Sequence, residues 1–300
     1  MIDLSPLYQT IADLFAFLAN TTHCRALDCM QARFMQQALL GLLLLAPMAA
    51  AMGVQVVNFR MAFFSDAISH SAFAGVAIGL LLAQDVHLTM VALALVIGLA
   101  ITSVGRRSSL STDTVIGVFF AAVVAFGLAI VSREPNIVRD VQMFLFGDIL
   151  TIGRDENLIL WEALLFVALL AFQVIGYNRM LYVGLNPVLA TAHRVRTRFY
   201  QYTYAALLTL VAIFAVWTVG VFLVTALLIV PAATARNLAR SAGGMFWWAI
   251  VVGLTSAVTG LIISAQDWAH TATGATVVLV AVVWFAGSCV VAAMRCPGKR

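Results

Sequence analysis

MAFFSDAISHSAFAGVAIG, residues 61–79, is an apolar segment with the length of a membrane-spanning helix, yet it contains an aspartate and a histidine. Asp66 and His70 are four residues apart, so a helix places both side chains on one face. An ionisable group at mid-bilayer costs from about 2.5 to over 10 kcal/mol, and such groups normally face a bundle interior or a water-filled path. The pair is therefore the first candidate for function.

Small residues follow on a neighbouring face of the same predicted helix. Ser71, Gly75 and Gly79 recur every four residues. Small residues at this spacing allow the backbone of a second helix to approach closely. We therefore expect these three positions to pack against another helix and to position Asp66 and His70.

The composition indicates an integral membrane protein. The 300 residues are 63% hydrophobic and 10% charged, and the mean hydropathy is +1.02. A span needs roughly 20 apolar residues, so the sequence predicts an all-α, polytopic transmembrane helical bundle of about eight or nine spans. We expect an N-terminal extension over 1–33 with an interfacial helix at 4–18, a membrane domain over 34–294, and a basic tail at 295–300.

Nine apolar segments fit this expectation, and the seventh is short and interrupted by a proline. They cover Phe34–Val57, Met61–Ala83, Leu88–Val104, Asp113–Val131, Leu158–Ile175, Thr203–Trp217, Gly220–Ala235, Met245–Ser264 and Ala275–Met294. The apolar stretch at 141–152 is too short to cross and predicts an interfacial or re-entrant helix. A polar loop is expected at 177–198, in which Asn186-Pro187 opens a short helix.

The loop charges predict an orientation. With alternating loops, one side collects Arg60, the arginines at 106–107 and 194–198, and the basic C-terminus, while the other collects most of the acidic residues. By the positive-inside rule the basic side is cytoplasmic. Nine spans then put the N-terminus outside and the C-terminus in the cytoplasm.

Two interpretations of Asp66 and His70 remain open at this point. If the span begins near Met61, a rise of ~1.5 Å per residue places His70 about 13 Å deep, near the midplane. Carboxylate oxygen and imidazole nitrogen are ligands for zinc, manganese and iron, and two such helices related by a twofold axis would supply four of them. The alternative is a structural hydrogen-bonded pair.

Other acidic and histidine side chains lie near the predicted span ends. Asp113 opens the fourth span, where it serves either as a helix-capping residue or as a cytoplasmic exit ligand. Two further pairs fall in outer loops, where they are either solvated or help to attract a cation. These pairs are Asp85 with His87 and Asp267 with His270.

The basic loop at 186–198 also has two interpretations. Its arginines suit a positive-inside anchor, whereas Pro187 at a helix start suits a surface helix that docks on another protein. His193 in this loop is interpreted as a surface residue.

Missing motifs exclude several functions. The sequence has no GxxxxGK[ST] phosphate loop, no HExxH and no GxSxG, so nucleotide hydrolysis of that type and hydrolase chemistry are disfavoured. An ion-coupled secondary carrier that needs no ATPase, and a membrane-embedded metalloenzyme, remain as rival functions. The absence of a clear inverted repeat weakens the carrier.

Several stretches resemble one family in order and spacing. They are RMAFFSDAISHSAFAGVAIG at 60–79, LSTDTVIGVFF at 110–120, FLFGDILTI at 144–152, LLIVPAATARNLARS at 227–241 and TGATVVLVAVVWF at 273–285. In these motifs the chain resembles the membrane permeases of the zinc, manganese and iron class of ATP-binding-cassette importers.

The resemblance implies a homodimeric importer subunit in a bacterial inner membrane. The metal, zinc, manganese or iron, would come from an extracytoplasmic metal-binding protein, and a cytosolic ATP-binding subunit would drive transport. Asp66 and His70 match the family's polar pair and would contact the cation. Asn186, Pro187, Ala190 and His193 lie where the ATPase-coupling helix is expected. We expect contact with membrane lipid, no permanently bound cofactor and no nucleic-acid partner.

Overall fold

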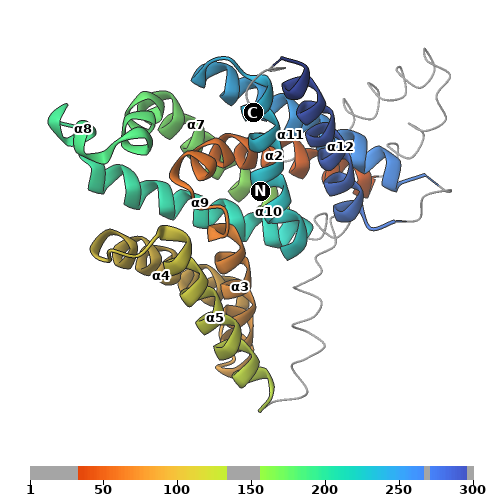
Figure 1. The fold of residues 1–300 in the computed structure, drawn as a ribbon. Coiled ribbons are helices and arrows are strands. Elements are labelled where there is room, and N and C mark those ends of the chain that lie inside the picture. Colours follow the sequence, from red (N-terminus) through yellow and green to blue (C-terminus); the bar gives the residue numbers. More distant parts are fainter. Residues whose placement is uncertain (1–32, 134–155, 267–270, 296–300) are drawn as a thin grey trace.

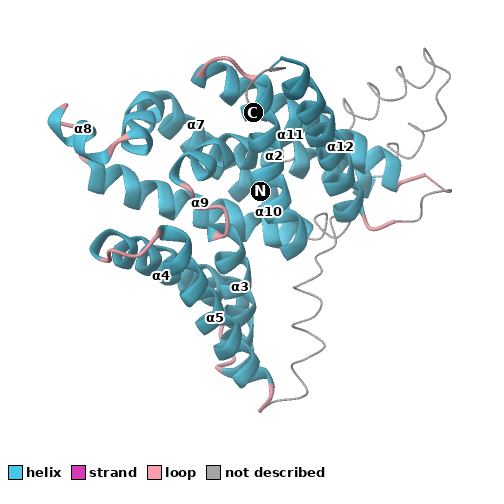
Figure 2. Ribbon diagram, viewed as in Figure 1, coloured by secondary structure: helices cyan, strands magenta, loops and turns pink. Residues whose placement is uncertain are grey.

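The computed structural model describes residues 33–133, 156–266 and 271–295, and every regular element in these ranges is an α-helix (Figure 2). The helices are α2 (Arg33–Phe59), α3 (Phe64–Leu81), α4 (Val86–Arg107), α5 (Thr112–Val131), α7 (Glu156–Leu185), α8 (Pro187–Ala192), α9 (Thr197–Val219), α10 (Val221–Leu238), α11 (Ala242–Ser264) and α12 (Thr273–Arg295). The predicted all-α class is confirmed.

The predicted number of spans is also confirmed. Within the described ranges, eight helices are long and apolar enough to cross a membrane, and Leu223–Leu238 in α10 is a shorter apolar helix. Helices suit this setting because a bilayer offers no hydrogen-bond partner to the backbone, so each segment must satisfy its own N–H and C=O groups. Pro47 and Pro231 lie inside α2 and α10, which continue through them.

Two predicted helix ends are wrong. The fifth span does not end at Ile175, because α7 continues to Leu185 and occupies much of the expected loop. Met180 and Val183 are buried there, and a Cβ atom at Gly184 would lie 3.3 Å from the ring of Phe59 at the end of α2. The sixth span likewise begins at Thr197 instead of Thr203. Apolar packing therefore extends both helices past the polar residues that predicted a loop.

The helices surround a core centred on α2. This helix packs against α7, α9, α10 and α11, while α12 covers α10 and α11 (Figure 1). The Tyr204 hydroxyl donates a hydrogen bond of 2.9 Å to the Met52 carbonyl, and a side chain at Gly53 would collide with the backbone of Leu228. The α2, α3 and α9 spans are the most buried, and α5 and α12 are the least buried.

The helices α3, α4 and α5 form a separate group in the lower part of Figure 1, and α9 packs against α3 and α4. A Cβ atom at Gly75 would lie 2.6 Å from the Met90 Cα of α4, and one at Gly79 would lie 2.5 Å from the Thr89 Oγ1. Ser71 is buried, and its hydroxyl donates to the Ile68 carbonyl. Gly75 and Gly79 therefore lie directly against α4.

A single residue separates α9 from α10. Gly220 has a φ of 88°, a conformation that glycine adopts readily and that residues with a Cβ adopt at a cost. The chain therefore turns sharply between two helices, and this turn directs the start of α10 toward α3, against which it packs.

Some predictions fall on residues that the structure does not describe. The interfacial helix at 4–18, the short helix at 141–152, Asp267 with His270, and the tail at 296–300 lie outside the described residues. The orientation of the chain in the membrane likewise stays a prediction.

Candidate metal path

Asp66 and His70 lie on a strip of α3 that the other described helices leave partly open. Most side chains between Phe64 and Gly79 are buried, and the half-buried ones are those of Asp66, His70, Phe73 and Ile78. The spacing of Asp66, His70 and Phe73 places them on one helical face. The helix begins at Phe64, three residues later than predicted, so the helical rise from its start to His70 is ~9 Å.

The carboxylate of Asp66 is held by a residue far away in the sequence. The Thr225 hydroxyl of α10 donates a hydrogen bond to Asp66 Oδ1, and the Ser65 hydroxyl lies 3.4 Å from the Thr225 oxygen. Asp66 also lies in the first turn of α3, where the positive end of the helix dipole stabilises a negative charge. Two elements therefore fix this carboxylate in position.

The imidazole of His70 packs on α5. Its ring lies edge-on to Phe120, with ring centroids 5.0 Å apart and an interplanar angle of 89°. Asp66 precedes His70 by four residues on the same face of α3. The structure thus brings the two predicted ligands into one site bounded by α3, α5 and α10.

This site offers few metal donors. No three His, Cys, Asp or Glu side chains come together anywhere in the described parts of the chain. The donors near one another are the Asp66 carboxylate, the His70 imidazole and the Thr225 hydroxyl. A tetrahedral zinc site needs four ligands, so one chain supplies an incomplete set.

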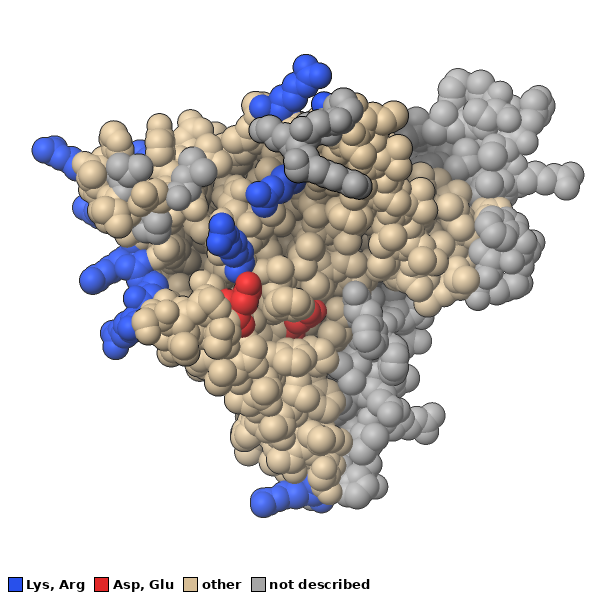
Figure 3. Space-filling view, viewed as in Figure 1, with Lys and Arg blue, Asp and Glu red and all other residues tan. Residues whose placement is uncertain are grey.

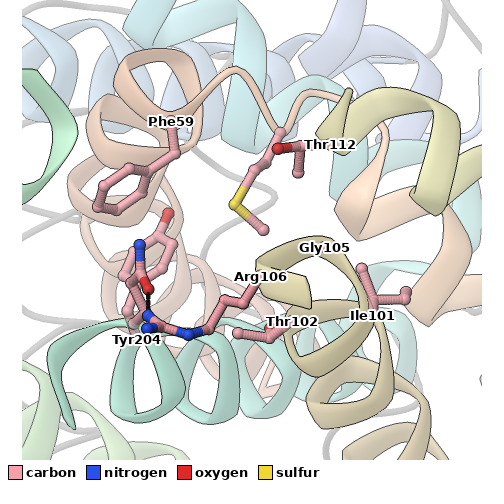
Figure 4. A pocket seen from close by; sticks show the side chains of 9 residues that line it. Phe59, Ile101, Thr102, Gly105, Arg106, Thr112 and Tyr204 are labelled. Atoms are coloured by element: carbon pink, nitrogen blue, oxygen red, sulfur yellow. Dashed lines mark hydrogen bonds between the residues drawn. The ribbon is translucent and has the colours of Figure 1, made fainter. Parts of the chain in front are cut away.

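A cavity of about 290 Å³ opens beside the turn that precedes α3 (Figure 4). Met61 and Phe59 of this turn line it, together with Arg106 at the end of α4 and Gln201 at the start of α9. An Arg106 Nη1 donates a hydrogen bond to the Gln201 side chain and so links α4 to α9. No carboxylate or imidazole lines the cavity, so it adds no strong metal ligand to the site.

The secondary candidates that the structure describes, Asp85, His87 and Asp113, lie at the ends of their own helices. Asp85 caps α4, because its Oδ1 accepts hydrogen bonds from the His87 and Leu88 N–H groups at 2.8 and 3.3 Å. His87 does not lie in a loop as predicted. It lies in the first turn of α4, and its ring stacks edge-on against Trp217, with centroids 4.8 Å apart.

Asp113 lies exposed in the first turn of α5, next to the residue that caps the helix. The cap is Ser111, whose hydroxyl accepts a hydrogen bond from the Thr114 N–H at 3.2 Å. A carboxylate in a first turn stabilises the helix through its dipole. This placement is the one expected of the capping interpretation.

The short helix that Asn186-Pro187 predicts is present as α8, and this prediction is confirmed. The Asn186 Oδ1 accepts a hydrogen bond from the Val188 N–H at 2.9 Å. Ala190 is fully buried, whereas Val188 is 76% exposed and His193 is exposed. Ala190 therefore holds α8 on the bundle, and Val188 faces away from it.

Sequence reasoning missed two residues. Thr225 had no visible signal, because a threonine in an apolar helix is common and its partner is 159 residues away. Glu162 did have a visible signal in the sequence, because it is a carboxylate inside an apolar span, as Asp66 is. Glu162 is fully buried in α7, and neither of its carboxylate oxygens has a hydrogen-bond partner among the described residues.

Comparison with known proteins finds a protein family that matches most of the chain. The model of the ABC 3 transport family matches residues 31–292. The high-affinity zinc uptake system membrane protein ZnuB of Haemophilus influenzae is 32% identical over 242 residues, which cover 81% of this chain and 91% of that protein. The manganese transport system membrane protein MntC of Listeria innocua is 34% identical over 258 residues, which cover 85% of this chain and 90% of the relative.

A solved structure has the same fold. The complex of PsaBC from Streptococcus pneumoniae with a Fab contains a chain that is 30% identical and superposes with a TM-score of 0.75. The match covers 88% of this chain and 94% of that one.

Proposed function

The chain belongs to the ABC 3 transport family, and from this membership we propose that it carries zinc or manganese into the cell through a membrane path containing Asp66 and His70. It is a multi-pass permease subunit, as its relatives are membrane proteins of zinc uptake and manganese transport systems. The observation that carries the proposal is the half-buried position of Asp66 and His70 on one face of α3, most of whose side chains are buried. Membership in this family does not support a secondary carrier.

A second copy of the chain completes the site in this proposal. Each chain offers one carboxylate and one imidazole, so two α3 helices facing each other supply the four donors of a tetrahedral site. A path must also release its ion, and ligands shared between two subunits separate when the subunits move apart. Binding then depends on how closely the subunits meet.

The partners act at the two ends of the path. An extracytoplasmic metal-binding protein delivers the ion, and a cytosolic ATP-binding subunit drives the movement of the two permease subunits relative to each other. We place the ATPase contact at α8, because Val188 is an exposed apolar side chain on a helix that the buried Ala190 fastens to the bundle. Asn186, Pro187 and His193 flank this contact, and the C-terminus lies on the same, cytoplasmic side.

Metal uptake tests the path. Cells that express the chain with its ATPase and binding protein should lose at least tenfold in ⁶⁵Zn or ⁵⁴Mn uptake on Asp66→Asn or His70→Ala, because either change removes a ligand. His87→Ala is the matched control, since it removes an exposed histidine at the start of α4. Membrane levels measured by blot must equal wild type. Uptake at the wild-type level in both site variants would exclude Asp66 and His70 as the path.

Association with the ATPase tests α8 separately. Val188→Glu places a charge on the exposed face of α8 and should abolish co-purification of the ATPase subunit. Leu110→Glu is the control, because Leu110 is 55% exposed in the loop between α4 and α5. Equal co-purification of both variants would place the ATPase contact elsewhere.

A further inference from the structure

A basic pocket lies where α7 ends, α8 turns and α9 begins. It has a volume of about 440 Å³, and its lining includes Arg179, His193, Arg194, Arg196, Phe199 and Tyr200. Figure 3 shows that arginine side chains gather along this edge of the molecule, over α8 and the neighbouring helix ends. We call this concavity the basic pocket. It is distinct from the Asp66 and His70 site on α3.

The positive charges of the pocket are not neutralised by any acidic side chain that the structure describes. Arg194 and Arg196 are exposed, and neither side chain makes a hydrogen bond or an ion pair within the described ranges. Arg194 also has a φ of 58°, so the backbone turns sharply between α8 and α9 at this point. Neighbouring like charges repel one another, and an anion bound between them relieves that repulsion.

One arginine of the pocket is held in place before any ligand arrives. An Arg179 Nη1 donates a hydrogen bond of 2.5 Å to the Tyr200 hydroxyl, and the guanidinium carbon lies 5.9 Å from the centre of the same ring. Tyr200 is itself 7% exposed, so its ring is a rigid support. A guanidinium has five N–H donors, and the remaining ones are free to bind a phosphate oxygen bidentately.

The pocket lies at the level where membrane spans end. The apolar span of α7 extends to Gly184 and that of α9 begins at Thr197. Tyr182 and Phe199 are 53% and 59% exposed beside the pocket. Exposed aromatic rings are enriched at the headgroup level of a membrane, and basic pockets between spans at this level bind anionic headgroups.

We propose that the basic pocket binds the phosphate of an anionic phospholipid headgroup, of the phosphatidylglycerol type. The paired guanidinium groups of Arg194 and Arg196, with the fixed Arg179, contact the phosphate, and the acyl chains extend along the exposed aromatic and apolar side chains of α7 and α9. A free phosphate ion would use the same charges but would gain nothing from the exposed rings. The inference requires only that the chain spans a membrane, so it stands apart from the metal path.

Lipid titration of the purified full-length chain tests this site. Native mass spectrometry in a neutral detergent measures binding of phosphatidylglycerol, with phosphatidylcholine and inorganic phosphate as the other probes. The double variant Arg194→Ala/Arg196→Ala should bind phosphatidylglycerol at least tenfold more weakly than wild type. The charge-matched control is Arg107→Ala/Arg240→Ala, which removes two exposed arginines outside the pocket and should change the affinity less than twofold. Thermal unfolding in phosphatidylcholine must be the same for all three proteins.

Three outcomes overturn the proposal. Equal losses in the two double variants indicate general attraction to the basic edge. Displacement of phosphatidylglycerol by inorganic phosphate, with binding of phosphate as tight as that of the lipid, indicates a free-anion site. Unchanged lipid binding in the pocket variant, with lost co-purification of the ATPase subunit, assigns these arginines to a protein contact.

Discussion

The close contact between α3 and α4 gives a graded prediction for three glycine-to-alanine substitutions. A Cβ at residue 75 would lie 2.6 Å from Met90 Cα, with the Met90 N and Thr89 O at 3.2 Å, and all three are backbone atoms. Carbon atoms normally approach to ~3.5–4.0 Å, so Gly75→Ala must move the two helices apart by about 1 Å. Overpacking of this kind costs about 1–3 kcal/mol.

The other two substitutions calibrate this cost. At residue 79 the nearest atom is the Thr89 hydroxyl oxygen at 2.5 Å, and a side chain can rotate away, although Val86 Cα at 3.0 Å still resists. At Gly287 in α12 no atom lies within 4 Å. Alanine is a better helix former than glycine by about 1 kcal/mol, and Gly287→Ala receives this gain without a clash. The expected order of stability is Gly75→Ala below Gly79→Ala below Gly287→Ala.

Thermal unfolding of the purified chain at one fixed scan rate measures the order, and a fixed rate is needed because such unfolding is commonly irreversible. A cost of about 1–3 kcal/mol corresponds to a midpoint lower by about 2–10 °C for a chain of this size class. Uptake should fall with the midpoint for Gly75→Ala, because the shift displaces Asp66 and His70 together with α3. Midpoints for Gly75→Ala and Gly287→Ala within 1 °C of each other, or a reversed order, would refute the close contact as a source of stability.

Three further changes follow from single contacts. Thr225→Val removes the hydrogen bond to Asp66 and should raise the metal concentration for half-maximal uptake about tenfold. Thr225→Ser keeps the hydroxyl and should show the wild-type value. Equal values for the two variants would count against a positioning role of Thr225. Glu162→Leu removes a buried carboxylate that has no hydrogen-bond partner among the described residues. The variant should have a higher unfolding midpoint, because the folded state gains about 1–3 kcal/mol of stability. A lower midpoint would indicate that the carboxylate does have a stabilising partner. Gly220→Ala forces a Cβ into a positive φ and should lower the midpoint, with a cost of about 1–2 kcal/mol, and an unchanged midpoint would contradict strain at this turn.

The spans were predictable because a bilayer imposes one rule on every segment. Backbone groups in lipid must be satisfied within the segment, so an apolar run of sufficient length becomes a helix whatever its neighbours are. The rule does not fix the residue at which a helix ends, and the predictions that failed concern helix ends. The end of α7 is polar enough to suggest a loop, but Met180 and Val183 pack inward and keep it helical to Leu185.

The candidate site was predictable only in part, because the local sequence shows which side chain is costly to bury but not which residue forms a hydrogen bond with it. The energetic cost of a carboxylate in an apolar run is visible locally and singled out Asp66. The hydroxyl that holds it comes from Thr225 on α10, and no local pattern connects two residues 159 positions apart. Glu162 differs in its surroundings. The energetic cost of its carboxylate was equally visible in the sequence, but no described residue donates a hydrogen bond to either oxygen.

The difference between Asp66 and Glu162 separates a path from a structural residue. Both carboxylates lie in spans, yet Glu162 is fully enclosed, while Asp66 is half-buried beside a histidine and is held by a hydroxyl. An ion can reach only the second arrangement. The described residues of one chain supply too few donors for a closed metal cage. In the proposed importer a second subunit would add its own donors, so we expect metal affinity to depend on the distance between two α3 helices, the variable that a cytosolic ATPase would change.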